Sequence, residues 1–157
     1  MTVHRPGALI AGAIVAAAIA APTAAQQPTL RPIPGVDLAL GMSRDGRAVV
    51  GRLGGPPTEQ AFRWDGGAPT PLGFLTGGTR SEARAASLAG DCIVGQGNST
   101  AGFRAFRWTS GAGMVDLGVL PGASNSRALG VSDDAQVIVG GSGFVNERAF
   151  RWTPAGM

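Results

Sequence analysis

Beyond residue 25 the chain alternates short apolar runs with turns rich in Gly and Pro, and no segment has helical periodicity. Three of the runs are apolar at successive positions, namely residues 48–50, 92–94 and 137–139. A strand with two apolar faces is typical of a sheet stacked between other sheets, as in the blades of a β-propeller. The pattern therefore predicts an all-β fold.

An internal repeat organises the chain from residue 38 onward. Ala-Phe-Arg-Trp occurs at residues 61–64, 105–108 and 149–152, so that successive copies are 44 residues apart. A serine and then Val-Val-Gly or Ile-Val-Gly precede each copy, and Leu-Gly follows the first two copies. Three concordant blocks in the same order indicate a repeat. The units are about 38–82, 83–127 and 128–157, and the last is incomplete.

Each unit predicts four short strands. The first ends at the shared serine, the second is the doubly apolar run, the third contains Phe-Arg-Trp, and the fourth holds the Leu-Gly pair. Asp45-Gly46 between the first two strands is a hairpin signal, because Gly tolerates positive φ. Ala135 replaces this glycine in the third unit, which predicts a different turn geometry there.

The third strand of each unit predicts the core. Its Phe and Trp share one face, and burying each stabilises the fold by about 1.5–3 kcal/mol if a neighbouring sheet covers it. A sugar-stacking platform is the alternative for the Trp set, but recurrence in every unit favours packing. The predicted core residues are Phe62, Trp64, Phe106, Trp108, Phe150 and Trp152.

The predicted fold is therefore a partial β-propeller-like array of repeat-built, four-stranded antiparallel blades. Propellers usually have four or more blades, and the repeats supply fewer. A fragment of a longer repeat protein and a chain that completes its fold by self-association both fit this number. In the isolated chain we expect an open face that carries Phe and Trp.

The units resemble the HAF repeat family of extracellular repeat proteins. Units of that family read Ser-x-Asp-Gly-x-x-Val-Val-Gly, then His-Ala-Phe-Arg-Trp-Thr, then Gly-Met-x-Asp-Leu-Gly-x-Leu. The match covers about residues 39–157 and is clearest in residues 107–109 and 113–118, whereas Gln60, Arg104 and Arg148 stand where the family has His. The resemblance implies an exported, propeller-like repeat protein without established catalytic residues.

Residues 1–25 have the organisation of a secretory signal peptide, with a weakly positive start, an apolar stretch over 8–21 and small residues before Gln26. An uncleaved membrane anchor is the alternative. Alanine contributes little to membrane insertion, and no positive cluster follows, which favours cleavage. Residues 26–37 are then a Pro-rich linker, and we expect the protein to be secreted, periplasmic or on a bacterial cell surface.

Charge and composition exclude several functions. The 13 basic side chains, all Arg, and the 10 acidic ones are scattered, which is unlike a nucleic-acid-binding surface. His4 is the only histidine and lies in the predicted signal peptide. After cleavage no histidine would remain for Ser-His or Cys-His catalysis or for an imidazole zinc site. We expect no metal, no cofactor and no nucleic-acid partner, and membrane contact only through an uncleaved signal peptide.

Cys92 is the only cysteine and aligns with the apolar residues Ala48 and Val137. We therefore expect a buried thiol that packs as a small hydrophobic group. A reactive or intermolecular thiol is the alternative.

Equivalent arginines are the candidate ligand-binding residues. Arg63, Arg107 and Arg151 occupy the same place in the three units, and guanidinium groups pair well with the carboxylates of an acidic carbohydrate. Closure of each blade through bonds to backbone carbonyls or to an Asp is the structural alternative.

Acidic residues gather at one turn of the repeat. Asp45, Asp133 and Asp134 belong to this turn, and Asp91 is displaced by one or two positions in the second unit. We interpret them as turn formers. A cation site or a pair of catalytic carboxylates is the alternative.

The leading functional hypothesis is an exported, non-enzymatic repeat protein that serves as a surface or binding scaffold. Its expected partners are carbohydrate, further repeats or copies of itself. A propeller-type, glycan-active enzyme that uses Asp or Glu is the second hypothesis, and a truncated fragment of a longer repeat protein is the third. Scattered acids and similar copies favour the scaffold.

Overall fold

The structure, a computed structural model, describes residues 29–155, which contain eleven strands and no helix. The predicted all-β fold is confirmed. The chain divides into two units, Met1–Arg31 and Pro32–Met157, and every strand belongs to the second. Among the described residues there is accordingly no helix with the length and hydropathy to cross a membrane. The predicted signal peptide, residues 1–25, lies outside the described part.

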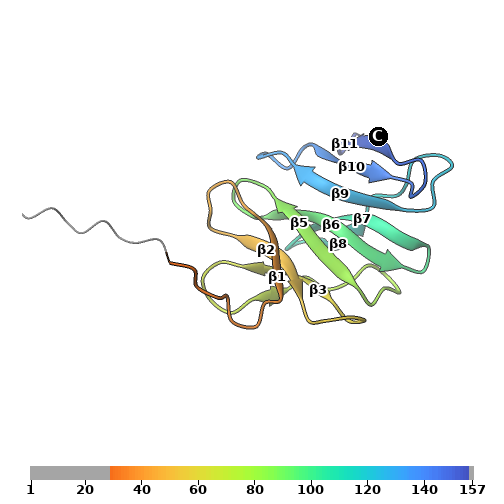
Figure 1. The fold of residues 1–157 in the computed structure, drawn as a ribbon. Helices are drawn as coiled ribbons and strands as arrows, with labels where there is room; N and C mark the ends of the chain where they lie inside the picture. The colour runs from red at the N-terminus through yellow and green to blue at the C-terminus, as the bar shows by residue number, and fades with distance from the viewer. Residues whose placement is uncertain (1–28, 156–157) are drawn as a thin grey trace, which may run out of the picture. The chain divides into compact units, whose positions relative to one another are not determined.

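The strands form three antiparallel sheets, one for each repeat (Figure 1). In each sheet, strands that follow one another in sequence are neighbours. The first sheet consists of β1 (Leu38–Met42), β2 (Val49–Leu53), β3 (Gln60–Trp64) and β4 (Thr70–Pro71). The second consists of β5 (Ser81–Ala86), β6 (Cys92–Ser99), β7 (Gly102–Thr109) and β8 (Gly113–Asp116). The third consists of β9 (Ser126–Val131), β10 (Ile138–Ser142) and β11 (Arg148–Trp152).

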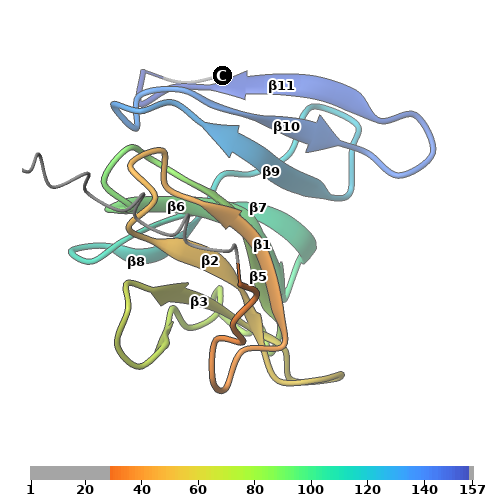
Figure 2. The same ribbon diagram turned by 60° about the vertical axis from the view of Figure 1, so that its left-hand side comes forward.

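Consecutive sheets pack face to face, with the second sheet between the other two (Figure 2). β5 packs on the first sheet and β9 packs on the second. A hydrophobic cluster fills each interface. The first cluster contains Val50, Ala61, Leu72, Leu75, Ala83, Ala86, Ile93 and Phe106. The second contains Cys92, Val94, Ala105, Leu117, Ala128, Ile138 and Phe150.

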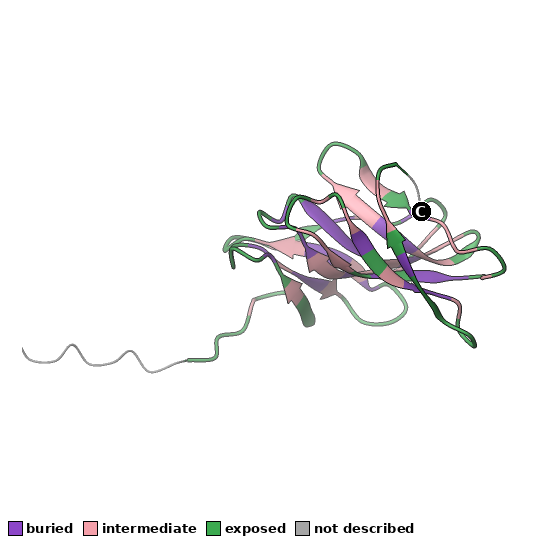
Figure 3. Cartoon of the chain, turned by 90° about the horizontal axis from the view of Figure 1, so that it is seen from above, coloured by how far each residue is buried: buried purple, intermediate pink, exposed green. Residues whose placement is uncertain are grey.

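The central strand β6 explains the doubly apolar run. Ile93 packs in the first cluster, whereas Cys92 and Val94 pack in the second, so both faces of the strand are covered. In the outer sheets one face of the same run is less covered: Val49 is half-buried and Val139 is 46% exposed. Buried residues accordingly concentrate on strands where sheets meet, and exposed ones lie in the turns and on the outer surfaces (Figure 3).

The fourth strand differs from the prediction. β4 and β8 end before the Leu-Gly pair, which follows each strand instead of lying within it. The N–H groups of Leu72 and Leu117 still donate to the carbonyls of Ala61 and Ala105, at 2.8 and 2.9 Å. The next residue is Gly73 or Gly118, at a φ of 85° or 80°. Positive φ turns the chain out of the sheet at that point, which ends the strand.

The turn at Ala135 also differs from the prediction. Its φ is 59°, close to the 74° of Gly46 and the 70° of Gly90. In all three turns the N–H of this residue donates to the carbonyl of the shared serine, at 2.9 to 3.0 Å. The expected change of geometry is therefore wrong. Contacts of the serine and the aspartate fix the turn, and they outweigh the roughly 1–2 kcal/mol that a non-glycine residue loses in the left-handed region.

Candidate ligand-binding groove between the second and third sheets

The predicted ligand-binding arginines lie in three different sheets. Arg63 donates through Nε to the carbonyl of Gly90 in the second sheet, at 3.0 Å, and through Nη1 to Asp65, at 2.7 Å. Arg63 thus makes the two contacts that are expected of a blade-closing arginine, one to a backbone carbonyl and one to an Asp. Arg107 is half-buried, and its Nε atom has no hydrogen-bond partner within the described residues, while Arg151 is exposed. The three side chains do not form one binding surface.

Four of the six predicted core residues, namely Phe106, Trp108, Phe150 and Trp152, lie on faces that pack against another sheet, whereas Phe62 and Trp64 lie on the face of the first sheet that no other sheet of residues 29–155 covers. Phe62 and Phe106 are fully buried and Phe150 nearly so, whereas all three Trp residues are half-buried. Trp108 packs against the first cluster and Trp152 against the second. Trp64 donates through Nε1 to the carbonyl of Gly67, at 2.8 Å.

The aspartates of the repeated turn bind the shared serine. Ser43 donates to Asp45 at 2.6 Å, and Ser132 donates to Asp134 at 2.5 Å. Each serine oxygen also accepts a backbone N–H five residues later, at 2.9 Å in these two units. The serine hydroxyl lowers the pKa of the Asp45 and Asp134 carboxyl groups. These contacts are the turn-forming role that the sequence favours.

Asp91 fills the same role from a different position in the chain. It follows Ser87 by four residues instead of two, yet it accepts the hydroxyl hydrogen of Ser87, which lowers its pKa. Asp133 is separate, since it pairs with Arg44 of the first sheet at 2.6 Å. Within residues 29–155, no three His, Cys, Asp or Glu side chains gather in a way that would hold a metal ion.

Cys92 is buried between the second and third sheets, in the second cluster. Burial raises the pKa of its thiol. The position agrees with the aligned residues Ala48 and Val137, which are also partly or fully buried.

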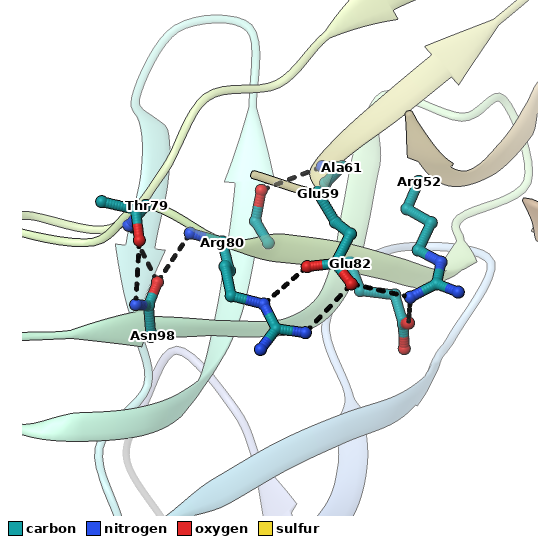
Figure 4. A network of polar contacts seen from close by, with 8 residues as sticks. Arg52, Glu59, Ala61, Thr79, Arg80, Glu82 and Asn98 are labelled. Carbon is teal, nitrogen blue, oxygen red and sulfur yellow. Dashed lines mark hydrogen bonds and ion pairs between the residues drawn. The ribbon is translucent and has the colours of Figure 1, made fainter. Parts of the chain in front are cut away.

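A network of ion pairs closes one edge of the interface between the first and second sheets (Figure 4). Glu59 accepts two hydrogen bonds from Arg80, at 2.6 and 3.0 Å, and one from Arg52, at 3.1 Å. Only 4% of its side chain is exposed, and the bonds from Arg80 lower its pKa. The space left among these side chains is about 30 Å³, which is too small for an organic ligand.

The interface between the second and third sheets has different residues at the equivalent positions. Gln96 occupies the register position of Arg52, because each lies opposite the alanine of Ala-Phe-Arg-Trp. By the same alignment Phe103 replaces Glu59, and Asn125 replaces Arg80. The buried acid and its two arginines are thus exchanged for an aromatic ring and two amides.

An open groove of about 220 Å³ results from this exchange. One ion pair lies within it, in which Arg127 donates through Nε and Nη2 to Glu147, at 2.8 and 2.6 Å. The pair raises the pKa of Arg127 and lowers that of Glu147. The residues that line the groove are Gln96, Phe103, Asn125, Ser126, Arg127, Gly143, Phe144 and Glu147.

The β10–β11 loop forms one wall of the groove. Phe144 and Val145 of this loop are 78% and 93% exposed. Phe144 borders both the groove and a second hollow of about 370 Å³, which is also lined by Val145 and Arg148. No motif in the sequence points to Phe144 or Val145 as functional residues. One feature of the sequence could have pointed to the groove. Phe103 departs from the repeat, since the other two units have the acidic residues Glu59 and Glu147 at this position.

No protein-family model and no curated protein matches the chain. Among solved structures, the fold is similar to that of TolB from Acinetobacter baumannii, with a TM-score of 0.59 and 16% sequence identity. The alignment covers 78% of this chain and 31% of TolB, so the chain spans about a third of that protein. TolB is a β-propeller protein, and at this identity the likeness concerns the fold alone. It supports a propeller-like arrangement of the three sheets.

Proposed function

We propose that this chain is an exported, non-enzymatic repeat protein of the HAF type, and that it is a binding scaffold for a neutral carbohydrate. One observation carries the proposal: the edge that ion pairs close in the first interface is an open groove in the second. The repeat supplies an internal comparison, because both edges have the same backbone register.

The lining of the groove fits a sugar. Phe103 and Phe144 offer ring faces on which the apolar face of a pyranose packs. The amides of Gln96 and Asn125 both donate and accept hydrogen bonds, as hydroxyl groups require. Arg127 and Glu147 neutralise each other, so the groove favours a neutral glycan over an acidic one.

The acid–base properties of the groove support a binding role over glycan hydrolysis. A glycosidase uses two carboxyl groups, one of which acts as an acid with a raised pKa. Glu147 is the one carboxyl group among the described lining residues, and Arg127 lowers its pKa. The described lining of the groove therefore lacks the second carboxyl group that a glycosidase needs, and the lowered pKa makes Glu147 a poor general acid.

Binding is tested on arrayed neutral oligosaccharides, namely glucan, mannan, xylan and chitin fragments, with calorimetry on any hit. We expect Phe103→Ala and Phe144→Ala to weaken binding about tenfold or more each, because each removes a stacking face. Phe74→Ala is the matched control, since Phe74 is 38% exposed and is not part of the groove lining. A silent array, or equal losses in all three variants, would overturn the proposal.

Export is supported by the signal-peptide pattern of residues 1–25, and TolB is itself a periplasmic protein. Expression of the full gene in a bacterial host, followed by fractionation and N-terminal sequencing, tests it. We expect a mature chain that begins at Gln26 outside the cytoplasm. An intact Met1 in the cytoplasmic fraction contradicts export.

A further inference from the structure

One face of the third sheet is open to solvent, whereas the equivalent faces of the other two sheets are buried. In the first sheet, Val50 and Ala61 lie on the face that packs against the second sheet, and both are fully buried. The third sheet has Val139 and Ala149 at the equivalent positions, and both are exposed. Arg151 lies opposite Val139 and is also exposed. We call Val139, Ala149 and Arg151 the leading face.

The first sheet has the complementary open face. Ala83 and Ala86 of β5 are buried against the preceding sheet. The equivalent residues of β1 are Ala39, which is exposed, and Met42, which is 65% exposed. We call Ala39, Met42 and the half-buried Val49 the trailing face. The expected exposure of a Phe- and Trp-bearing face is wrong for Phe62, which is fully buried, whereas Trp64, opposite Val49, is half-buried beside these aliphatic residues.

Polar groups on the two faces are also complementary. In the first interface, Arg63 donates to the carbonyl of Gly90 at 3.0 Å. The leading face presents Arg151 at the position of Arg63, and the turn beside the trailing face presents Gly46 at the position of Gly90. An arginine donor and its carbonyl acceptor are therefore available for one more copy of the same contact.

A second polar contact recurs in both interfaces. Ala61 and Ala105 each donate a backbone N–H to a serine hydroxyl of the following sheet, Ser81 or Ser126, at 2.9 Å. Ala149 stands at this position on the leading face. By register, Asp37 stands at the serine position beside the trailing face, and its carboxylate is also an acceptor.

We infer that the leading face of one copy of this chain docks on the trailing face of a second copy, and so repeats the interface that the chain already uses twice. Such a contact is heterologous, because two different surfaces meet, and it closes into a ring when the rotation allows. Two copies of residues 29–155 bring six sheets, a number within the four to eight blades that propellers have. The closed form is therefore a dimer with two such interfaces.

Sedimentation velocity on the full chain, from about 1 to 100 μM, tests the inference. We expect a dimer for the unmodified protein. Val139→Arg on the leading face and Met42→Arg on the trailing face should each weaken self-association at least about tenfold. Both residues are exposed within one copy, so both variants should keep the β-sheet circular dichroism spectrum and the melting temperature of the monomer.

Mixing the two variants distinguishes this interface from a symmetric one. Each variant keeps one intact face, so an equimolar mixture should form a heterodimer, whereas each variant alone stays monomeric. Pairing of leading face with leading face would instead leave Met42→Arg dimeric and give no recovery on mixing. Val115→Arg is the control, because Val115 is 45% exposed on the edge strand β8, away from both faces.

A monomer at every concentration, or loss of the dimer in Val115→Arg to the same degree, would overturn the inference. The result is independent of the carbohydrate proposal, because neither open face includes Phe103 or Phe144. Val139→Arg should keep the glycan affinity of the unmodified chain while it loses the dimer.

Discussion

The carbonyl oxygen of Glu82 on β5 lies so close to the α-carbon of Gly95 that a β-carbon on this glycine would overlap it. Gly51 and Gly140 have the same relation to the carbonyls of Leu38 and Arg127. All three glycines end the Val-Val-Gly or Ile-Val-Gly block, and each lies beside a register shift in the strand pair. The irregular strand approaches its neighbour closely at that point, so the glycine of the repeat is a steric requirement.

Gly95→Ala should therefore lower the free energy of unfolding by about 3 kcal/mol, because the new methyl group meets backbone that is held in a sheet. Urea unfolding followed by circular dichroism measures the change. Gly111→Ala is the control, since a β-carbon there has open space and the φ of Gly111 is not positive. It should change the free energy of unfolding by less than about 0.5 kcal/mol. Equal effects of the two variants would refute the steric explanation.

The features that the sequence predicts well are those that repeat. The doubly apolar β6 run and the Phe positions follow from strand geometry, and the structure buries Ile93 and Phe106 accordingly. Contacts that depend on the distance between sheets are not predictable in this way. Arg63 binds the carbonyl of Gly90 because the next sheet brings that turn within 3.0 Å, which no spacing in one unit encodes.

The groove could not be predicted from the repeat because it arises where one unit departs from the others. Phe103 for Glu59 looks like ordinary drift in a sequence alignment. Its consequence depends on Asn125, which directly precedes β9, and on Phe144 of the β10–β11 loop, which meet Phe103 only in the folded chain. Likewise, Asp91 reaches Ser87 although its position in the turn differs, because side-chain reach compensates for the shift.

Ala135→Gly should stabilise the protein by about 1 kcal/mol. Ala135 has a φ of 59°, in the left-handed region that costs an alanine roughly 1–2 kcal/mol, and a glycine removes most of that cost. Greater freedom of the glycine in the unfolded chain offsets part of the gain. The same urea titration measures the difference. The reverse change, Gly46→Ala, should lower the free energy of unfolding, and a stabilising Gly46→Ala would contradict the argument.

Stability should be constant from about pH 7 to 5 and should decrease below about pH 4. Serine hydroxyl groups lower the pKa of Asp45, Asp91 and Asp134 in the folded chain from the ordinary value of 3.8. The unfolded state then binds protons first as the pH falls, so stability that is present above the ordinary pKa is lost as the pH falls through the folded pKa. Melting temperatures from pH 7 to 2.5 measure this loss.

The matched variant for the acid range replaces the three aspartates by asparagine. Its stability should depend less steeply on pH below 4, although it starts from a lower value at neutral pH. The dependence of stability on pH that remains reports Glu59, Glu147 and Asp65, whose pKa values are lowered by Arg80, Arg127 and Arg63 respectively. An unchanged slope in the triple variant would mean that the serine contacts do not hold the carboxylates in their charged form.

Cys92 should be chemically inert in the folded protein. The thiolate is the reactive form of cysteine, and burial both raises the pKa of this thiol and keeps reagents away from it. Reaction then requires opening of the interface between the second and third sheets, where Cys92 packs with Val94 and Ile138.

At pH 8, modification of Cys92 in the folded protein by a disulfide reagent should be at least about 100-fold slower than in 6 M guanidinium chloride. Ser110→Cys, in a Cys92→Ala background, supplies an exposed thiol that should react at the unfolded rate. Equal rates for Cys92 and for the thiol introduced by Ser110→Cys, both in the folded protein, would instead favour a reactive Cys92, and with it a role in intermolecular pairing.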